Sequence, residues 1–269
     1  MWGPEPVRLC TEDGIVLSAD YYTRVTSGPS YLLAHGFTGS AARPEVKAVA
    51  EHLVERGNCV LALNFRGHGT SEGLSSIGAD EVADIAAGLA WLRVKRPGVP
   101  VVTLGFSMGA SVAVRQAGLA GAASSVRQAG LAGEAGLVGP DAVIAVSGPG
   151  RWYERGTKPM RRLHFGAETR IGRLILARAF RTRIGHGWEL LPVSPVETAG
   201  AIGVPVLIVH GDADPYFPLD HPRMLAAMIP AATLWIEPGM GHAENATSLE
   251  LLDRMDVWAH TALSGTIGT

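Results

Sequence analysis

The sequence predicts an α/β protein with a mostly parallel, twisted sheet flanked by helices. Short apolar runs alternate with longer segments whose apolar residues recur at helical spacing, and this βαβα order is typical of a parallel sheet. The runs are continuously apolar, as in strands that helices cover on both faces. The six expected strands are SYLLAHGF (30–37), CVLALNF (59–65), PVVTLGFS (100–107), DAVIAVSG (141–148), VPVLIVHG (204–211) and ATLWIEPG (232–239).

The N-terminal stretch predicts a β-hairpin. VRLCT (7–11) and IVLSADYY (15–22) are joined by Glu12-Asp13-Gly14, and an Asp-Gly pair between apolar runs is a common hairpin turn.

Two helices are clear from their periodicity. PEVKAVAEHLVERG (44–57) ends at Gly57, and ADEVADIAAGLAWLRVKR (79–96) ends just before Pro97. The alternation of strands and helices continues through both ends of the 269-residue chain, which favours one domain for the sheet and its helices.

Composition excludes several classes of protein. Hydrophobic residues make up 47% of the chain, too many for a disordered protein, and the net charge of −2 argues against a nucleic-acid binder. No secretory signal and no apolar run of membrane-spanning length are visible. Cys10 and Cys59 lie in apolar runs and are expected as buried thiols in a reducing compartment. We therefore expect a cytoplasmic protein, and the sequence carries no signal for its oligomeric state.

Two segments interrupt the pattern. VRQAGLAG occurs at 114–121 and again at 126–133, and a shift of 12 residues turns the second copy by about 120° around a helix axis. Because one helix cannot bury both copies on the same side, the second is expected as a loop or broken helix at the surface, with no assigned function.

The other segment, 151–192, is strongly basic. It holds nine arginines and Lys158 against three glutamates, and RIGRLILARAF (170–180) predicts an amphipathic helix. Because it lies between two expected strands, we expect a small helical cap there. The cap would be inserted after 141–148, the sixth strand of the chain when the two hairpin strands are counted. The core domain would then comprise 1–150 and 193–269.

Ligands bind α/β sheets at the carboxyl ends of the strands, so the loops that follow strands are the place to look for chemistry. Ser107 lies between Gly105 and Gly109, which alone is compatible with an ordinary tight turn. Asp214 and His242 each follow a later strand, and the order serine, aspartate, histidine is the one that a nucleophile elbow requires.

These three residue types form a catalytic triad. A serine hydroxyl needs a base to remove its proton, and the base needs a carboxylate to orient it. Asp212 is the alternative carboxylate in HGDADP. The oxyanion of the intermediate needs backbone donors, for which Met108 at the helix start and Phe37 after His35-Gly36 are the candidates.

With these motifs the sequence resembles the α/β-hydrolase superfamily, in particular its bacterial esterase, lipase and serine-aminopeptidase-like branch. The resemblance implies Ser107 as nucleophile, Asp214 as acid and His242 as base, with oxyanion donors at Phe37 and Met108. It spans nearly the whole chain except the duplicated and basic segments. NFRGHGTS (64–71) resembles a turn of this family in which Asn64 replaces the usual aspartate.

The resemblance implies hydrolysis of a small-molecule carboxylic ester through an acyl-serine intermediate. A thioesterase acting on an anionic carrier, an aminopeptidase-like amide hydrolase and a non-catalytic binding protein are the alternatives. No metal site is expected, because no metal-ligand spacing such as His-Glu-x-x-His is present. No cofactor is expected either, because no phosphate-binding glycine loop follows the first parallel strand.

The basic cap has three interpretations. Its arginines, with Arg161, Arg162 and Arg173 as candidates, would bind a carboxylate or phosphate of the substrate. They would otherwise form a solvated helix face, or a contact with a membrane surface through the amphipathic helix.

Overall fold

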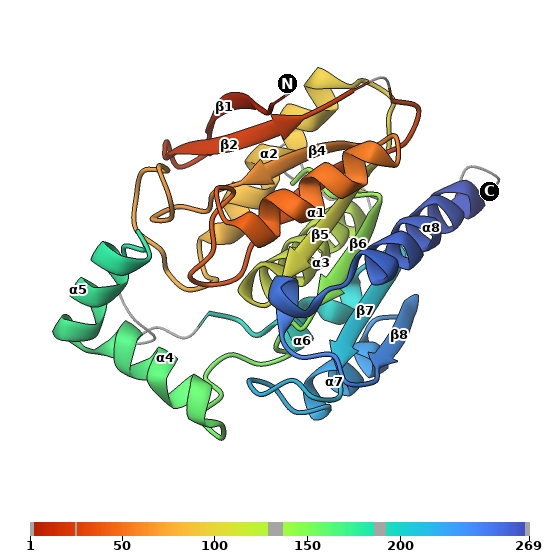
Figure 1. Cartoon of the computed structure of the whole chain (residues 1–269). Helices are drawn as coiled ribbons and strands as arrows, with labels where there is room; N and C mark the ends of the chain where they lie inside the picture. Colours follow the sequence, from red (N-terminus) through yellow and green to blue (C-terminus); the bar gives the residue numbers. More distant parts are fainter. Residues whose placement is uncertain (1–2, 25, 129–136, 186–191, 267–269) are drawn as a thin grey trace.

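The computed structural model describes residues 3–24, 26–128, 137–185 and 192–266. Within these residues eight strands form one sheet in the order β1-β2-β4-β3-β5-β6-β7-β8 (Figure 1). β1 pairs antiparallel with β2 and β2 with β4, and all other neighbours are parallel. The strands are β1 (Glu5–Cys10), β2 (Val16–Tyr22), β3 (Ser30–Ala34), β4 (Cys59–Leu63), β5 (Val101–Phe106), β6 (Ala142–Val146), β7 (Val206–Gly211) and β8 (Ala232–Glu237). The predicted hairpin and mostly parallel sheet are confirmed.

Helices cover both faces of the sheet (Figure 1). In β3, Tyr31 and Leu33 pack into one hydrophobic cluster, while Leu32 and Ala34 pack into the other. This explains why the strand is continuously apolar. The first cluster includes residues of α1 (Pro44–Glu55) and α8 (Leu249–Thr266), and the second includes residues of α2 (Glu81–Lys95), α3 (Met108–Gln128) and α7 (Asp220–Met228).

Two burial predictions are wrong, and both concern edge strands. β8 was expected to be buried like the inner strands, but its residues are only half-buried because β7 is its one neighbour in the sheet. Cys10 ends β1 at the opposite edge, where alternate residues face outward, and it is exposed. Cys59, in the inner strand β4, is buried as expected.

The duplicated segment is described only in part. α3 continues without a break through the first copy at 114–121 and is described as far as Gln128. Residues 129–136, which include most of the second copy, lie outside the described residues, so the prediction of a loop or broken helix at the surface stays a prediction.

Between β6 and β7 the chain forms α4 (Lys158–Glu168) and α5 (Arg170–Ala179), which stand apart from the layers of the sheet (Figure 1). Thr169 ends α4 and caps α5, since its hydroxyl accepts a hydrogen bond from the N–H of Gly172 at 2.9 Å. We call α4 and α5 the cap. The short elements α6 (Pro195–Thr198) and η1 (Ala199–Ala201) follow before β7, and η2 (Ala243–Ala246) precedes α8.

The chain that leaves the cap is attached to the core by backbone hydrogen bonds. The N–H of Arg183 donates to the carbonyl oxygen of Gly67 at 2.8 Å, and the N–H of Ser75 donates to the carbonyl oxygen of Arg183 at 2.8 Å. Residues 186–191, at the end of the predicted cap segment, lie outside the described residues. Over the described part of the chain, no helix combines the length and apolar character needed to cross a membrane.

Candidate active site

Ser107 lies at the turn from β5 into α3, with a backbone φ of 51°. This left-handed region is unfavourable for a residue with a side chain, so the surrounding structure must hold it there. The flanking glycines make the turn sterically possible. A Cβ at Gly105 would lie 2.5 Å from the carbonyl oxygen of Gly109, and a Cβ at Gly109 would overlap the carbonyl oxygen of Ala34. The turn has the geometry of the predicted elbow.

The three residues predicted to form a triad lie in hydrogen-bonding distance of one another. Nε2 of His242 is 2.9 Å from Oγ of Ser107, and Nδ1 of His242 is 2.7 Å from Oδ2 of Asp214. The loops after β5, β7 and β8 supply them, so the parallel sheet brings together residues that are 135 and 28 positions apart along the chain.

The carboxylate of Asp214 is fully buried and well satisfied. Its other oxygen, Oδ1, accepts hydrogen bonds from the N–H groups of Tyr216 at 2.7 Å and Phe217 at 3.2 Å. Burial alone would raise the pKa of Asp214, but the hydrogen bonds from His242 and from these backbone groups outweigh it and hold the pKa below its ordinary value. Asp214 is therefore ionised and able to orient the imidazole.

The alternative carboxylate, Asp212, faces elsewhere. It is exposed, and its Oδ1 accepts a hydrogen bond from the N–H of Gly239 at 2.6 Å. Of the two aspartates in HGDADP, the one that contacts His242 is Asp214.

Phe37 and Met108, the expected oxyanion donors, both border a cavity next to Ser107. Met108 is the first residue of α3, where a backbone N–H has no partner within the helix. Among the described residues, neither N–H group donates a hydrogen bond to another protein group. Both are available to a substrate oxygen.

Two buried histidines support the loop that carries Phe37. Nδ1 of His35 donates to the carbonyl oxygen of Gly36 at 2.7 Å, and Nε2 of His68 contacts the carbonyl oxygen of Phe37. Burial lowers the pKa of both imidazoles, that of His35 to about 3, so His35 is neutral. These contacts engage the carbonyl oxygens of Gly36 and Phe37 and so hold the backbone of the loop in place.

The turn that resembles the family pattern at 64–71 is a structural support. Oδ1 of Asn64 accepts from the N–H of Ala41 at 2.8 Å, and its Nδ2 donates to Oγ of Ser18 at 2.9 Å. The amide thus ties the hairpin to the loop after β3. This agrees with a scaffolding role for the position where the family has aspartate.

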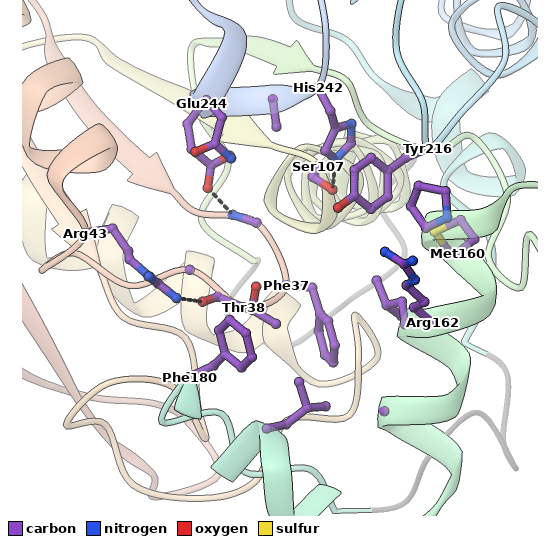
Figure 2. A pocket seen from close by; sticks show the side chains of 18 of the residues that line it. Phe37, Thr38, Arg43, Ser107, Met160, Arg162, Phe180, Tyr216, His242 and Glu244 are labelled. Carbon is purple, nitrogen blue, oxygen red and sulfur yellow. Dashed lines mark hydrogen bonds between the residues drawn. The ribbon is translucent and has the colours of Figure 1, made fainter. Parts of the chain in front are cut away.

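A cavity of about 560 Å³ opens beside Ser107 and His242 (Figure 2). Its floor is formed by loops at the carboxyl ends of the strands, and its opposite wall by α4 and α5, including Met160, Leu163 and Ile175. A volume of this size is in the range of small-molecule sites.

Of the three candidate arginines, the cavity is lined only by Arg162, which extends from α4 toward Ser107 and Tyr216 in Figure 2. Arg161 is exposed and donates to the carbonyl oxygen of Gly156 at 3.1 Å. Arg173 donates to the carbonyl oxygens of Ala167 at 2.6 Å and Gly185 at 2.9 Å, so it stabilises the cap. The structure does not bring Arg161 and Arg173 to the cavity.

Sequence reasoning missed two residues of this cavity. The ring of Tyr216 stacks on the imidazole of His242 with centroids 4.2 Å apart, and Oε1 of Glu244 faces the N–H of Gly36 at 3.4 Å. Burial raises the pKa of Glu244 above its ordinary value. Both lie within two residues of a triad member, which is the signal that could have found them. In the described part of the chain, no three His, Cys, Asp or Glu side chains gather as a metal site would require.

The sequence model of the alpha/beta hydrolase family matches residues 31–257, and the chain belongs to this family. Among curated proteins, an uncharacterized protein of Rickettsia prowazekii is 36% identical over 100 residues, which are 35% of this chain and 42% of that protein. The chain therefore spans less than half the length of that relative.

Two solved esterase structures and that of another alpha/beta hydrolase share the fold. The esterase Pf2001 of Pyrococcus furiosus superposes with a TM-score of 0.70 at 22% identity, over 97% of this chain and 93% of that one. Est1E of Butyrivibrio proteoclasticus, solved with ferulic acid, gives a TM-score of 0.63 at 20% identity, over 95% and 99% of the two chains. The alpha/beta hydrolase GrgF of a Penicillium species gives 0.73 at 14% identity, over 98% and 100%.

Proposed function

We propose that the protein is a serine esterase that cleaves carboxylic esters through an acyl intermediate on Ser107. The observation that carries this proposal is the continuous line of hydrogen bonds from Asp214 Oδ2 through His242 to Ser107 Oγ, at 2.7 and 2.9 Å. It begins at a buried carboxylate and ends at an open cavity.

The first half of the reaction forms the acyl-enzyme. His242 takes the proton of Ser107 as Oγ attacks the ester carbonyl, and Asp214 stabilises the imidazolium that results. The carbonyl oxygen becomes an oxyanion and accepts hydrogen bonds from the N–H groups of Phe37 and Met108. One such donor lowers the barrier by about 3–4 kcal/mol. His242 then gives its proton to the alcohol as it leaves.

The second half reverses these roles. A water molecule takes the place of the alcohol, His242 removes its proton, and the hydroxide attacks the acyl carbon. Collapse of the second intermediate returns the proton to Ser107 and releases the acid.

A thioesterase is the second candidate. Arg162 lines the cavity, and its guanidinium would pair with an anionic group of the carrier. The aminopeptidase alternative is weaker. It needs free carboxylates in the basic segment. Glu168 is already paired with Arg155 at 2.6 Å, and Glu154 accepts a hydrogen bond from the N–H of Gly156 at 2.6 Å and lies 3.6 Å from Nε2 of His221.

The test combines turnover with labelling. Wild type should hydrolyse p-nitrophenyl acetate and react with a fluorophosphonate probe, and Ser107→Ala should lose both. Ser264→Ala, which removes an exposed hydroxyl far along α8, is the matched control and should keep both. Labelling without ester turnover would favour thioesters, and absence of both in folded wild type would refute a serine hydrolase.

A further inference from the structure

Ser107 lies between two cavities of very different size. The large one, of about 560 Å³, contains His242 in its wall. The second measures about 30 Å³ and is lined by Met108 but not by His242. The two share Phe37, Ser107 and Phe217 on the core side, and Met160 and Leu163 from α4.

The chemistry decides which part of an ester each cavity receives. The leaving alcohol takes its proton from Nε2 of His242, so its oxygen must lie next to that nitrogen and its substituent must extend into the large cavity. The carbonyl oxygen faces the N–H groups of Phe37 and Met108. The acyl substituent is the third group on the tetrahedral carbon, and it is left with the small cavity.

The small cavity holds very little. A cavity needs roughly 10–15 Å³ to hold one water-sized group. About 30 Å³ therefore accommodates two or three such groups, namely the carbonyl oxygen beside Phe37 and Met108 and one or two carbons of the acyl substituent. Its walls include the apolar side chains of Ile77 and Trp152, and Arg151 and Glu154 also contribute atoms to the lining.

The wall at Ile77 is held rigidly. Ile77 has a φ of 55°, a strained value for a β-branched residue. Its loop is fixed by the buried carboxylate of Glu81, which accepts hydrogen bonds from Ser75 Oγ at 2.6 Å, Ser76 N at 3.0 Å and Gly78 N at 2.8 Å. Strain maintained by a fully satisfied buried carboxylate indicates that the position of Ile77 is functionally constrained.

The wall at Trp152 depends on the same loop. A Cβ at Gly78 would lie 2.5 Å from the indole ring, so the ring packs directly on the backbone of Gly78. On its other side, Nε1 of Trp152 donates to the carbonyl oxygen of Val193 at 3.1 Å. A longer acyl chain cannot displace this ring without breaking that hydrogen bond.

We propose that Ile77 and Trp152 restrict the acyl group to about two or three carbons, so that the enzyme cleaves acetyl and propionyl esters of larger alcohols. This inference rests on the proposed esterase function.

The first test is a pair of isomers, octyl acetate and methyl nonanoate, which place the same long chain on opposite sides of the ester. Wild type should hydrolyse octyl acetate with a kcat/KM about 100-fold higher, since a hydrophobic pocket rejects an extra methylene by about 10- to 200-fold. Equal rates, or a preference for methyl nonanoate, would overturn the inference while leaving the esterase proposal intact. Absence of turnover, with no labelling of Ser107 by a fluorophosphonate, would refute the esterase proposal itself and the acyl assignment with it.

The second test enlarges the small cavity. Trp152→Ala and Ile77→Ala should raise kcat/KM on p-nitrophenyl octanoate by about tenfold or more and change that on p-nitrophenyl acetate much less. Trp152→Phe, which keeps an aromatic ring, guards against loss of folding and should give a smaller gain. Ile175→Ala, in the wall of the large cavity only, should keep the wild-type acyl profile. An unchanged profile in both folded alanine variants would overturn the inference.

Discussion

Oδ2 of Asp214 lies 2.7 Å from Nδ1 of His242, and the carboxylate that makes this contact is completely buried. Replacing it with an amide would leave the volume unchanged but allow the imidazole to adopt the wrong tautomer. Asp214→Asn should therefore lower kcat for p-nitrophenyl acetate by about ten-thousand-fold.

Asp212→Asn is the matched control for that change. Asp212 is exposed and contacts the backbone of Gly239, so its amide variant should retain activity within about threefold of wild type. Comparable losses in the two variants would mean that the orienting carboxylate is not specific to Asp214.

Gly109 in α3 packs closely against the end of β3, so a larger residue at this position should destabilise the fold. A methyl group at position 109 would overlap the carbonyl oxygens of Ala34 and His35, so Gly109→Ala should lower the free energy of unfolding by about 3 kcal/mol. Gly203→Ala, where a Cβ would meet no atom within 4 Å, should change it by less than about 1 kcal/mol. Urea unfolding followed by circular dichroism measures both, and equal effects would contradict the packing argument.

The buried histidines predict how stability depends on pH. Burial holds the pKa of His35 at about 3 in the folded protein, while the unfolded chain takes up the proton near pH 6.5. Below pH 6.5 the unfolded state therefore binds more protons, and the free energy of unfolding falls as pH falls. His35 contributes about 1.4 kcal/mol per pH unit between pH 6 and pH 4.

Urea unfolding at several pH values tests this slope. His35→Asn should be less stable at pH 7, but its free energy of unfolding should fall less steeply toward pH 4 than that of wild type. An identical slope in the two proteins would mean that His35 takes up its proton over the same pH range in the folded and the unfolded protein.

Arg162 predicts a preference for anionic substrates. Its guanidinium lines the cavity, and a hydrogen bond to a charged group contributes about 1.5–3 kcal/mol. Arg162→Ala should raise KM by about tenfold or more for an acetate ester whose alcohol carries a carboxylate, and should leave a neutral ester of the same size unchanged. Arg161→Ala is the control, because Arg161 contacts the backbone of Gly156. If Arg162→Ala changes KM equally for the two esters, Arg162 does not bind the anionic group. The cap arginines would then be interpreted as a solvated helix face.

The third interpretation of the cap, contact with a membrane surface, rests on exposed apolar side chains beside its arginines. Ile171 and Leu174 in α5 are 67% and 50% exposed. Vesicle sedimentation would test this interpretation. Binding to anionic vesicles that is lost in Ile171→Ser would support it, and absence of binding would remove it.

Much of the fold could be predicted because each feature depends on residues that are close together in the sequence. Continuous apolar runs predicted the inner strands, and the spacing of apolar residues predicted α1 and α2. The errors at Cys10 and β8 have one cause. Whether a strand lies at the edge of a sheet depends on its pairing order, and a local run of apolar residues does not record that order.

The sequence by itself determined the α/β fold and the serine between two glycines, because the strain of a sharp strand–helix turn selects glycine on both sides of it. It also determined the order of serine, aspartate and histidine after separate strands. Only the tertiary structure decided that Asp214 rather than Asp212 contacts His242, and that Arg162 alone of the three candidate arginines lines the cavity. It also decided that the two cavities next to Ser107 differ in volume. Side-chain direction and cavity volume arise from the packing of loops that lie far apart in the chain, and no local pattern records them.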